Sequence, residues 1–296
     1  RLPLSSSPEI FDNSINAWFK DMTNYDLSLM HFAFNAASEL ASELGLADEA
    51  AHWKAIGAQL PDLNLDEEGA LTFAKGFPYD QSHRHFSHAI SIHPLGLIDW
   101  SQGGKSQEII KATLKKLQDF GPDYWCGYSY SWFGNMKARA FDGEGAADAL
   151  RTFAECFCLP NTFHANGDQT KSGKSKFTYR PFTLEGNFAF AAGIQEMLLQ
   201  SHTGVIRVFP AVPVAWQDVS FDKLRAMGAF LVSAEKVAGQ VRQVRILPEQ
   251  GGMLRLAIPE GCKVASVTGN KGDKLEKEGV LILETEKDKT VTVQYN

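Results

Sequence analysis

The chain has 296 residues, of which 44% are hydrophobic and 22% are charged, fractions typical of a soluble globular protein with one large domain or two ordinary ones. Its formal net charge of −6 argues against a nucleic-acid-binding protein, because phosphate binding needs a concentrated basic face. No apolar run approaches the length that crosses a bilayer, so we expect neither nucleic acid nor a membrane as a partner.

The N-terminus and the cysteines do not identify a compartment. The chain begins Arg1-Leu-Pro, with neither a methionine nor a signal-like segment, and we expect a mature, processed or truncated product. Cys156 and Cys158 lie too close together for the usual zinc knuckle, and no second pair completes one. We expect all four cysteines to be buried thiols rather than a disulfide framework.

Apolar residues in the first two-thirds of the chain recur with the three-and-four spacing of amphipathic helices. The pattern is strongest from residue 24 to 44, and Gly45 ends it. Long polar connections cover residues 61–80 and 160–180. Further helices are predicted for residues 48–60, 106–120, 146–156 and 185–200, and from the end of the aromatic stretch 124–132 to residue 141.

The apolar period changes from 3.6 to 2 after residue 203, and short alternating runs of this kind indicate antiparallel strands. We therefore predict a helical domain over residues 1–203 and a small antiparallel β-sandwich over residues 204–296. The predicted strands are residues 205–209, 229–234, 239–246, 253–258 and 290–295.

The helical part looks incomplete as a free-standing fold. About seven helices come as hairpins with wide apolar faces, and no repeat of fixed length predicts a solenoid. A closed ring of helical hairpins needs about twice as many helices. We expect this part to be the second half of such a ring, with the missing N-terminal half of the same protein as its partner.

Residues 81–96 hold four of the chain's eight histidines beside Arg84. Read as a helix, this segment places Arg84 and His88 four residues apart on one face. Histidine donates, accepts or exchanges a proton near neutral pH, so the cluster suits a polar pocket. The alternative is a polar helix start whose histidines cap backbone groups. Pro94 would end or kink a helix here.

Four sequence blocks lie in an order that resembles a known family. They are Ser5-Ser-Ser-Pro-Glu9, Thr23-Asn-Tyr-Asp-Leu27, His83-Arg-His-Phe-Ser-His88 and Leu184-Glu-Gly-Asn-Phe188, of which the histidine block is the most specific. Together they resemble the C-terminal part of glycoside hydrolase family 95, the inverting α-L-fucosidases and α-L-galactosidases. The resemblance implies an (α/α)6 toroid, only half of it present here, followed by a C-terminal sandwich.

The chain departs from the family pattern in its carboxylates. The family places its catalytic acid in a Gln-Glu-Trp segment shortly before the histidine block, where this chain has Thr72 and Phe73. The family's aspartate before Gly-Asn-Phe becomes Glu185, which is one methylene longer. The asparagines that hold the family's attacking water lie upstream of Arg1. The resemblance therefore predicts a sugar pocket but leaves the acid unidentified.

Inverting hydrolysis needs a proton donor and a base whose carboxyl groups lie about 6.5–9.5 Å apart. The resemblance assigns the catalytic, water-activating carboxylate to Glu185, and a helix N-terminus would favour its ionised form; a plain helix-start glutamate is the alternative. Asn187 is its predicted orienting neighbour. Candidates for the acid, none of them convincing, are Glu9, Asp66, Glu67, Glu68 and Asp80.

The remaining predicted substrate contacts are polar or aromatic side chains. Arg84 and His85, with His88, are predicted to bind sugar hydroxyls and the ring oxygen. Trp125 and Trp132 are predicted as a sugar platform, with a plain core role as the alternative. His164 is predicted to reach the site from the polar loop 161–168, or else to shape the turn.

Metal and cofactor chemistry receive no support from the sequence. His83, His85 and His88 lack a carboxylate or cysteine at a matching spacing, so we predict no metal and no cofactor. The predicted function is an exo-acting glycosidase that cleaves an oligosaccharide or glycoside, a substrate class that favours a secreted or periplasmic location. A polysaccharide lyase and a non-catalytic glycan-binding relative remain alternatives.

Overall fold

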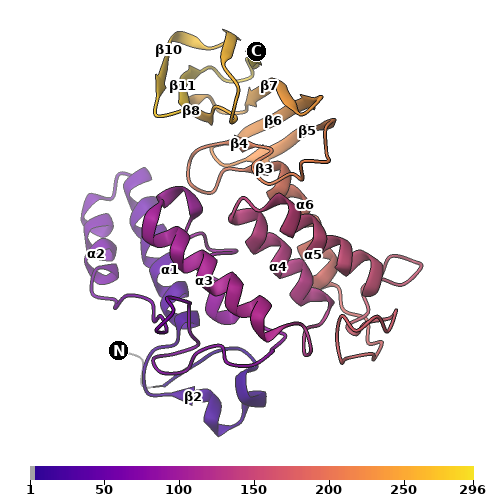
Figure 1. Cartoon of the computed structure of the whole chain (residues 1–296). Helices are drawn as coiled ribbons and strands as arrows, with labels where there is room; N and C mark the ends of the chain where they lie inside the picture. The colour runs from indigo at the N-terminus through magenta and orange to yellow at the C-terminus, as the bar shows by residue number, and fades with distance from the viewer. Residues whose placement is uncertain (1–3) are drawn as a thin grey trace.

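The computed structural model describes residues 4–296, with the helices first and the strands of its two main sheets after them (Figure 1). This order confirms the predicted change from a mainly α to a β-rich region. No helix within the described range is both long and apolar enough to cross a membrane. The six α-helices of that range are α1 (Asn24–Glu43), α2 (Ala47–Gly57), α3 (Gly104–Phe120), α4 (Gly127–Arg139), α5 (Gly143–Cys156) and α6 (Glu185–Leu198).

Local sequence signals explain where these helices begin and end. The Thr23 side chain accepts a hydrogen bond from the Asp26 amide and so caps α1, and Asp142 caps α5 in the same way. Gly45 follows α1 with φ of 74°, the left-handed conformation that glycine adopts most easily. The stacked rings of Phe34 and Trp53, 6.0 Å apart, join α1 to α2 as an antiparallel pair.

The histidine segment is not a helix, so the prediction that Arg84 and His88 share a helix face is wrong. Only Ser87–Ala89 form a short 3-10 turn, and residues 81–86 are irregular. The reason lies in the backbone amides, which donate to side chains instead of to carbonyls one turn earlier. The amide of His83 donates to the Tyr79 hydroxyl at 2.9 Å, and that of His85 donates to His83 Nδ1 at 3.1 Å.

The strands after residue 203 form two antiparallel sheets. One has the order β5 (Val219–Ala226), β6 (Phe230–Val237), β7 (Gln240–Pro248), β12 (Val291–Tyr295) and β9 (Val264–Thr268). The other has the order β10 (Lys271–Lys277), β11 (Val280–Thr285) and β8 (Gly252–Ala257). Alternate residues of both sheets, among them Val232, Val244, Leu254 and Leu283, share one fully buried core.

Two further pairs of short strands lie outside the two main sheets. The pair β1 (Ser5–Ser6) and β2 (Trp18–Phe19) folds the N-terminal loop back on itself. The pair β3 (Leu199–Gln200) and β4 (Arg207–Val208) follows α6 directly and leads into the sheets.

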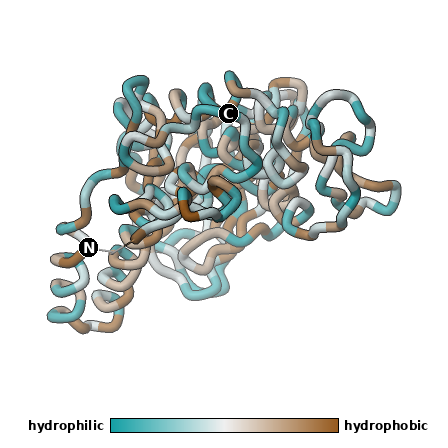
Figure 2. The backbone as a smooth tube through the Cα atoms, turned by 90° about the horizontal axis from the view of Figure 1, so that it is seen from below, coloured by the Kyte–Doolittle hydropathy of each residue, from teal (hydrophilic) through white to brown (hydrophobic). Residues whose placement is uncertain are grey.

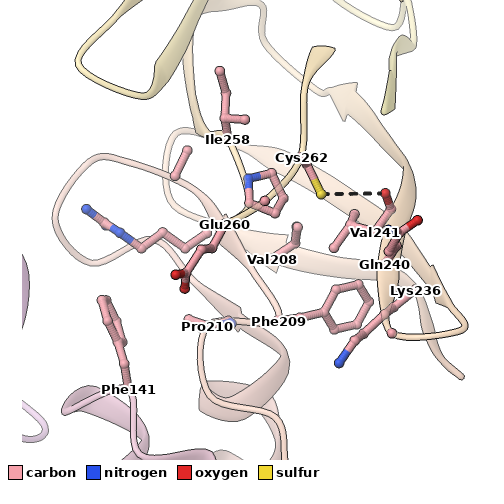
Figure 3. Close-up of a pocket in the computed structure, with 15 residues that line it drawn as sticks. Phe141, Val208, Phe209, Pro210, Lys236, Gln240, Val241, Ile258, Glu260 and Cys262 are labelled. Atoms are coloured by element: carbon pink, nitrogen blue, oxygen red, sulfur yellow. Dashed lines mark hydrogen bonds between the residues drawn. The ribbon is translucent and has the colours of Figure 1, made fainter. Parts of the chain in front are cut away.

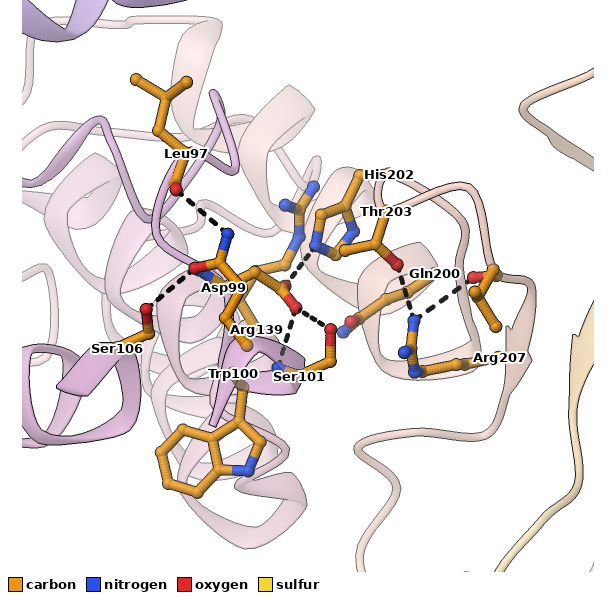
Figure 4. Close-up of polar contacts among 12 residues, drawn as sticks. Leu97, Asp99, Trp100, Ser101, Ser106, Arg139, Gln200, His202, Thr203 and Arg207 are labelled. Atoms are coloured by element: carbon orange, nitrogen blue, oxygen red, sulfur yellow. Dashed lines mark hydrogen bonds and ion pairs between the residues drawn. The ribbon is translucent and has the colours of Figure 1, made fainter. Parts of the chain in front are cut away.

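A buried polar network connects the helices to the loop between β3 and β4 (Figure 4). His202 in that loop places Nε2 2.6 Å from Asp99 Oδ2, and the Asp99 side chain is only 3% exposed. Burial by itself raises the pKa of Asp99, but hydrogen bonds from His202 and Ser101 outweigh it and lower the pKa to about 2. Beside them, Arg139 makes two hydrogen bonds to Glu196 at 2.6 and 2.8 Å.

Replacing Asp99 with Asn should lower the free energy of unfolding by about 2 kcal/mol at pH 7, because the folded-state pKa lies nearly two units below the ordinary value of 3.8. A lowered pKa contributes stability above the ordinary value and loses it as the pH falls toward 2. The difference from wild type should therefore shrink between pH 4 and pH 2. Urea unfolding measures it, and Asp119→Asn, at an exposed ion pair, should change stability much less. An equal effect of the two variants would contradict this account.

Candidate functional site

A carboxylate from the N-terminal loop meets the histidine segment at the surface. Glu9 Oε2 lies 2.5 Å from Arg84 Nη2 and 2.9 Å from His85 Nε2. The three side chains are 42%, 31% and 25% exposed, respectively, so a ligand can reach all of them. Glu9 has φ of 58°, a left-handed conformation that is uncommon outside glycine and often found at functional sites.

Buried hydroxyl groups hold this loop in place. Ser7 Oγ lies 2.6 Å from Ser87 Oγ, next to the histidines. Ser5 Oγ accepts from the Thr23 amide at 2.9 Å and donates to Asp26 at 2.5 Å. Three of the four sequence blocks that predicted the family are therefore in direct contact, although they lie up to 80 residues apart.

The charges of this cluster favour ligand binding over proton donation. Burial raises the pKa of Glu9, but His85 and Arg84 outweigh it, so the net shift is below the ordinary value of 4.5. A carboxyl group with a lowered pKa is ionised near neutral pH and suits an acid catalyst poorly. Asp66 shows the same net lowering, because it pairs with Lys116 at 2.9 Å.

The second part of the candidate site is the start of α6. Glu185 is the first residue of that helix and is exposed. Its charge acts on His164, whose pKa burial lowers and Glu185 raises in part, and on Tyr128, whose pKa both burial and Glu185 raise. Through Gly186, the residue after Glu185, the start of α6 contacts α4.

The first two turns of α4 connect the two parts. Ser129 Oγ donates to the backbone oxygen of Arg84 at 2.7 Å, and Ser131 Oγ donates to that of Gly186 at 3.1 Å. One helix thus positions both the Arg84 segment and Gly186, the residue that follows Glu185. That Arg84, His85 and Glu185 open into one common cavity remains a prediction.

Tyr179 is an exposed side chain that no sequence pattern singled out. Its ring lies in the 160–180 loop and is 41% exposed. Burial raises its pKa, and its hydroxyl accepts a hydrogen bond from Asn166 Nδ2 at 3.2 Å. Nothing distinguishes this tyrosine from the chain's other six without knowledge of the fold.

His164 and Asn187 hold the polar loop against α6. The His164 amide donates to Asn187 Oδ1 at 3.0 Å, and Asn187 Nδ2 donates to the Thr162 oxygen at 3.0 Å. His164 has no exposed surface, which corrects the prediction that it contacts substrate. A Cβ at Gly127 would lie 2.3 Å from His164 Nε2, and one at Gly186 would lie 2.5 Å from Nδ1, so these two glycines make room for the ring.

Three other predicted substrate contacts lie in the core, which corrects those predictions too. His88 is 1% exposed and stacks on Tyr79 with ring centroids 5.2 Å apart, and burial lowers its pKa to about 3. Trp125 and Trp132 are 3% and 7% exposed, and Trp132 Nε1 donates to the backbone oxygen of His93. In this structure the tryptophans offer no exposed ring face to a sugar.

The segment where the acid was expected provides no carboxylate. Phe73 is buried and its ring packs edge-on against His88, 4.7 Å between centroids. Thr72 is buried as well and donates to the Asn64 oxygen at 3.2 Å. Among residues 4–296, no group of three or more His, Cys, Asp or Glu side chains is placed to hold a metal ion.

The chain is similar to known glycosidase sequences along nearly its whole length. Residues 2–198 match the glycosyl hydrolase family 95 catalytic domain, and residues 200–293 match the glycoside hydrolase family 95 C-terminal domain. An alpha-L-fucosidase 2 from Arabidopsis thaliana is 28% identical over 231 residues, which make up 76% of this chain and 27% of that protein. The chain thus spans about a quarter of that relative's length. These matches confirm the resemblance predicted from the sequence blocks.

Replacing Glu9 with Gln should lower the pKa of His85 further below its ordinary value of 6.5. Burial lowers this pKa, and the negative charge of Glu9 opposes the effect, so removal of the charge leaves burial less opposed. NMR titration of the imidazole protons measures the shift. Asp119→Asn removes an exposed carboxylate from α3 and should leave His85 unchanged. A pKa of His85 that rises or stays constant in Glu9→Gln would show that the ion pair does not form.

Proposed function

Because this chain belongs to glycoside hydrolase family 95, we propose that the protein containing it cleaves a terminal α-L-fucoside or a related glycoside with inversion. The observation that carries the proposal is the exposed cluster of Glu9, Arg84 and His85. Arginine and histidine donate hydrogen bonds and a carboxylate accepts them. Such a cluster can hold several hydroxyl groups of one sugar ring in a fixed orientation.

In this proposal Glu185 is the base that activates water. Its carboxylate is exposed at the N-terminus of α6, where the helix dipole stabilises negative charge. Asn187 has a positioning role rather than a catalytic one, because its Oδ1 and Nδ2 are both hydrogen-bonded to backbone groups of the neighbouring loop. It positions the start of α6, and hence Glu185, relative to that loop.

A second function, glycan binding without turnover, has one observation in its favour. Phe73 fills the position where relatives of this kind are expected to hold the acid, and its side chain is buried and apolar. In a working hydrolase the acid then comes from another carboxylate, and in a binding relative there is none. Activity measurements separate the two.

We also propose that the helices form half of an (α/α)6 toroid and that the two sheets form its C-terminal sandwich. Large apolar side chains on α1 and α6 are exposed, among them Phe32 at 45%, Leu40 at 63% and Phe188 at 66%. Figure 2 shows hydrophobic segments along the projecting α1–α2 pair. An N-terminal half of the same protein, as the relative's greater length suggests, would cover these faces.

The test of function is turnover of aryl α-L-fucosides and α-L-galactosides by the full-length protein. Glu185→Gln should reduce kcat about 100-fold to 10,000-fold, the usual contribution of acid–base catalysis, while substrate binding persists. Glu155→Gln, at an exposed glutamate of α5, should leave kcat unchanged. Full activity of Glu185→Gln would end the proposal for this residue. A wild-type protein that binds these glycosides but turns over none would support the binding relative instead.

A further inference from the structure

A cavity lies where the connection after α4 meets the strand region (Figure 3). Its volume is about 460 Å³, within the range of about 300–1,000 Å³ common for small-molecule sites, which often lie at such junctions. It shares no residue with the cluster of Glu9, Arg84 and His85. The residues that matter for its chemistry are Phe141, Arg207, Phe209, Lys236, Gln240 and Glu260.

Two phenylalanines of the lining have an unusual backbone conformation. Phe141 has φ of 58° and Phe209 has φ of 53°, a region that bulky residues rarely adopt. Phe141 is the second residue after the end of α4, beyond the C-cap Ala140, a position where glycine is the preferred residue. The Phe209 ring packs against that of Phe221 in the core, whereas Phe141 is half-buried and lines the cavity, so Phe141 is the ring that a ligand can reach.

Three polar side chains that line the cavity have no hydrogen-bonding partner among the described residues. Within residues 4–296, the side chains of Lys236, Gln240 and Glu260 have no hydrogen bond or ion pair with another protein group. Arg207, in contrast, is held by Thr203 and by the Val205 oxygen at 2.8 and 3.3 Å. The cavity therefore presents free donors, a free acceptor carboxylate and an aromatic ring around one space.

We propose that this cavity is a second, non-catalytic binding site for a neutral oligosaccharide. Side chains of both charge signs line it, so a strongly charged ligand would meet repulsion from one of them. A sugar hydroxyl both donates and accepts, which matches Gln240, Glu260 and Lys236. The C–H face of a sugar ring matches the apolar face of Phe141.

The choice of a glycan rests on the proposed function, because the lining chemistry alone selects only an uncharged, hydroxyl-rich ligand with an apolar face. A site of this kind would keep a long or branched glycan close to the enzyme while another part of it is cleaved. Tethering of this kind raises the effective concentration of substrate without a new catalytic group.

The test is an NMR titration of the complete, isotopically labelled chain with lactose and with methyl α-L-fucoside. We expect saturable shifts of the Gln240 side-chain amide and the Phe141 backbone amide, with a Kd in the millimolar range. Gln240→Ala should weaken binding about tenfold, as for one lost hydrogen bond. Gln195→Ala, at an exposed glutamine of α6, should leave the Kd unchanged.

Phe141→Gly removes the ring from the cavity. Glycine relieves the left-handed strain at this position and so offsets part of the lost contact with the Trp100 ring, 6.5 Å away between centroids. Sugar binding should fall at least tenfold, and circular dichroism checks that the variant is folded. Unchanged binding in both Phe141→Gly and Gln240→Ala overturns the proposal, and so does the absence of shifts at the cavity with either sugar. Shifts confined to Arg84 and His85 overturn it too, yet they leave the proposed hydrolase intact. Shifts at the cavity support it even when Glu185→Gln shows no loss of turnover.

Discussion

Helix α4 carries polar side chains into the protein interior, and each of them needs a hydrogen-bond partner there. Ser129, Ser131 and Asn135 have no exposed surface. Their partners are backbone oxygens of Arg84, Gly186 and Ala189, which belong to two other segments. Since a buried hydroxyl or amide without a partner costs about 1–3 kcal/mol, these bonds fix how the histidine segment and α6 lie against α4.

This constraint explains how an irregular segment can carry a precise site. The histidine segment has no regular structure of its own around Arg84, yet Ser129 holds its backbone and Ser7 holds Ser87. The second contact brings Glu9 to the same place, where it pairs with Arg84 and His85. Ser131 of the same helix holds the backbone of Gly186, the residue after Glu185.

The sequence predicted most elements with a clear apolar period, but β5, β9, β10 and β11 have no counterpart among the predicted strands. Strand β10 went unrecognised because all seven of its residues are exposed, so no alternation marks it. The histidine segment was misread because spacing alone does not reveal that its amides donate to Tyr79 and His83 side chains. Trp125 and Trp132 were predicted to contact sugar because a dense aromatic run looks the same in a core and on a platform. The histidine block did predict the family, since its residue order is specific.

The most direct test of the account is backbone hydrogen exchange of the wild type, Ser129→Ala and Ser131→Ala. Local opening governs this exchange, and each variant removes one side-chain hydrogen bond to the backbone of one segment. Ser129→Ala should speed exchange about tenfold in residues 82–88, and Ser131→Ala should do so in residues 183–190, each with little change in the other segment. Unchanged exchange in both segments, or the same uniform increase in both variants, would contradict the claim that α4 positions the two parts of the site.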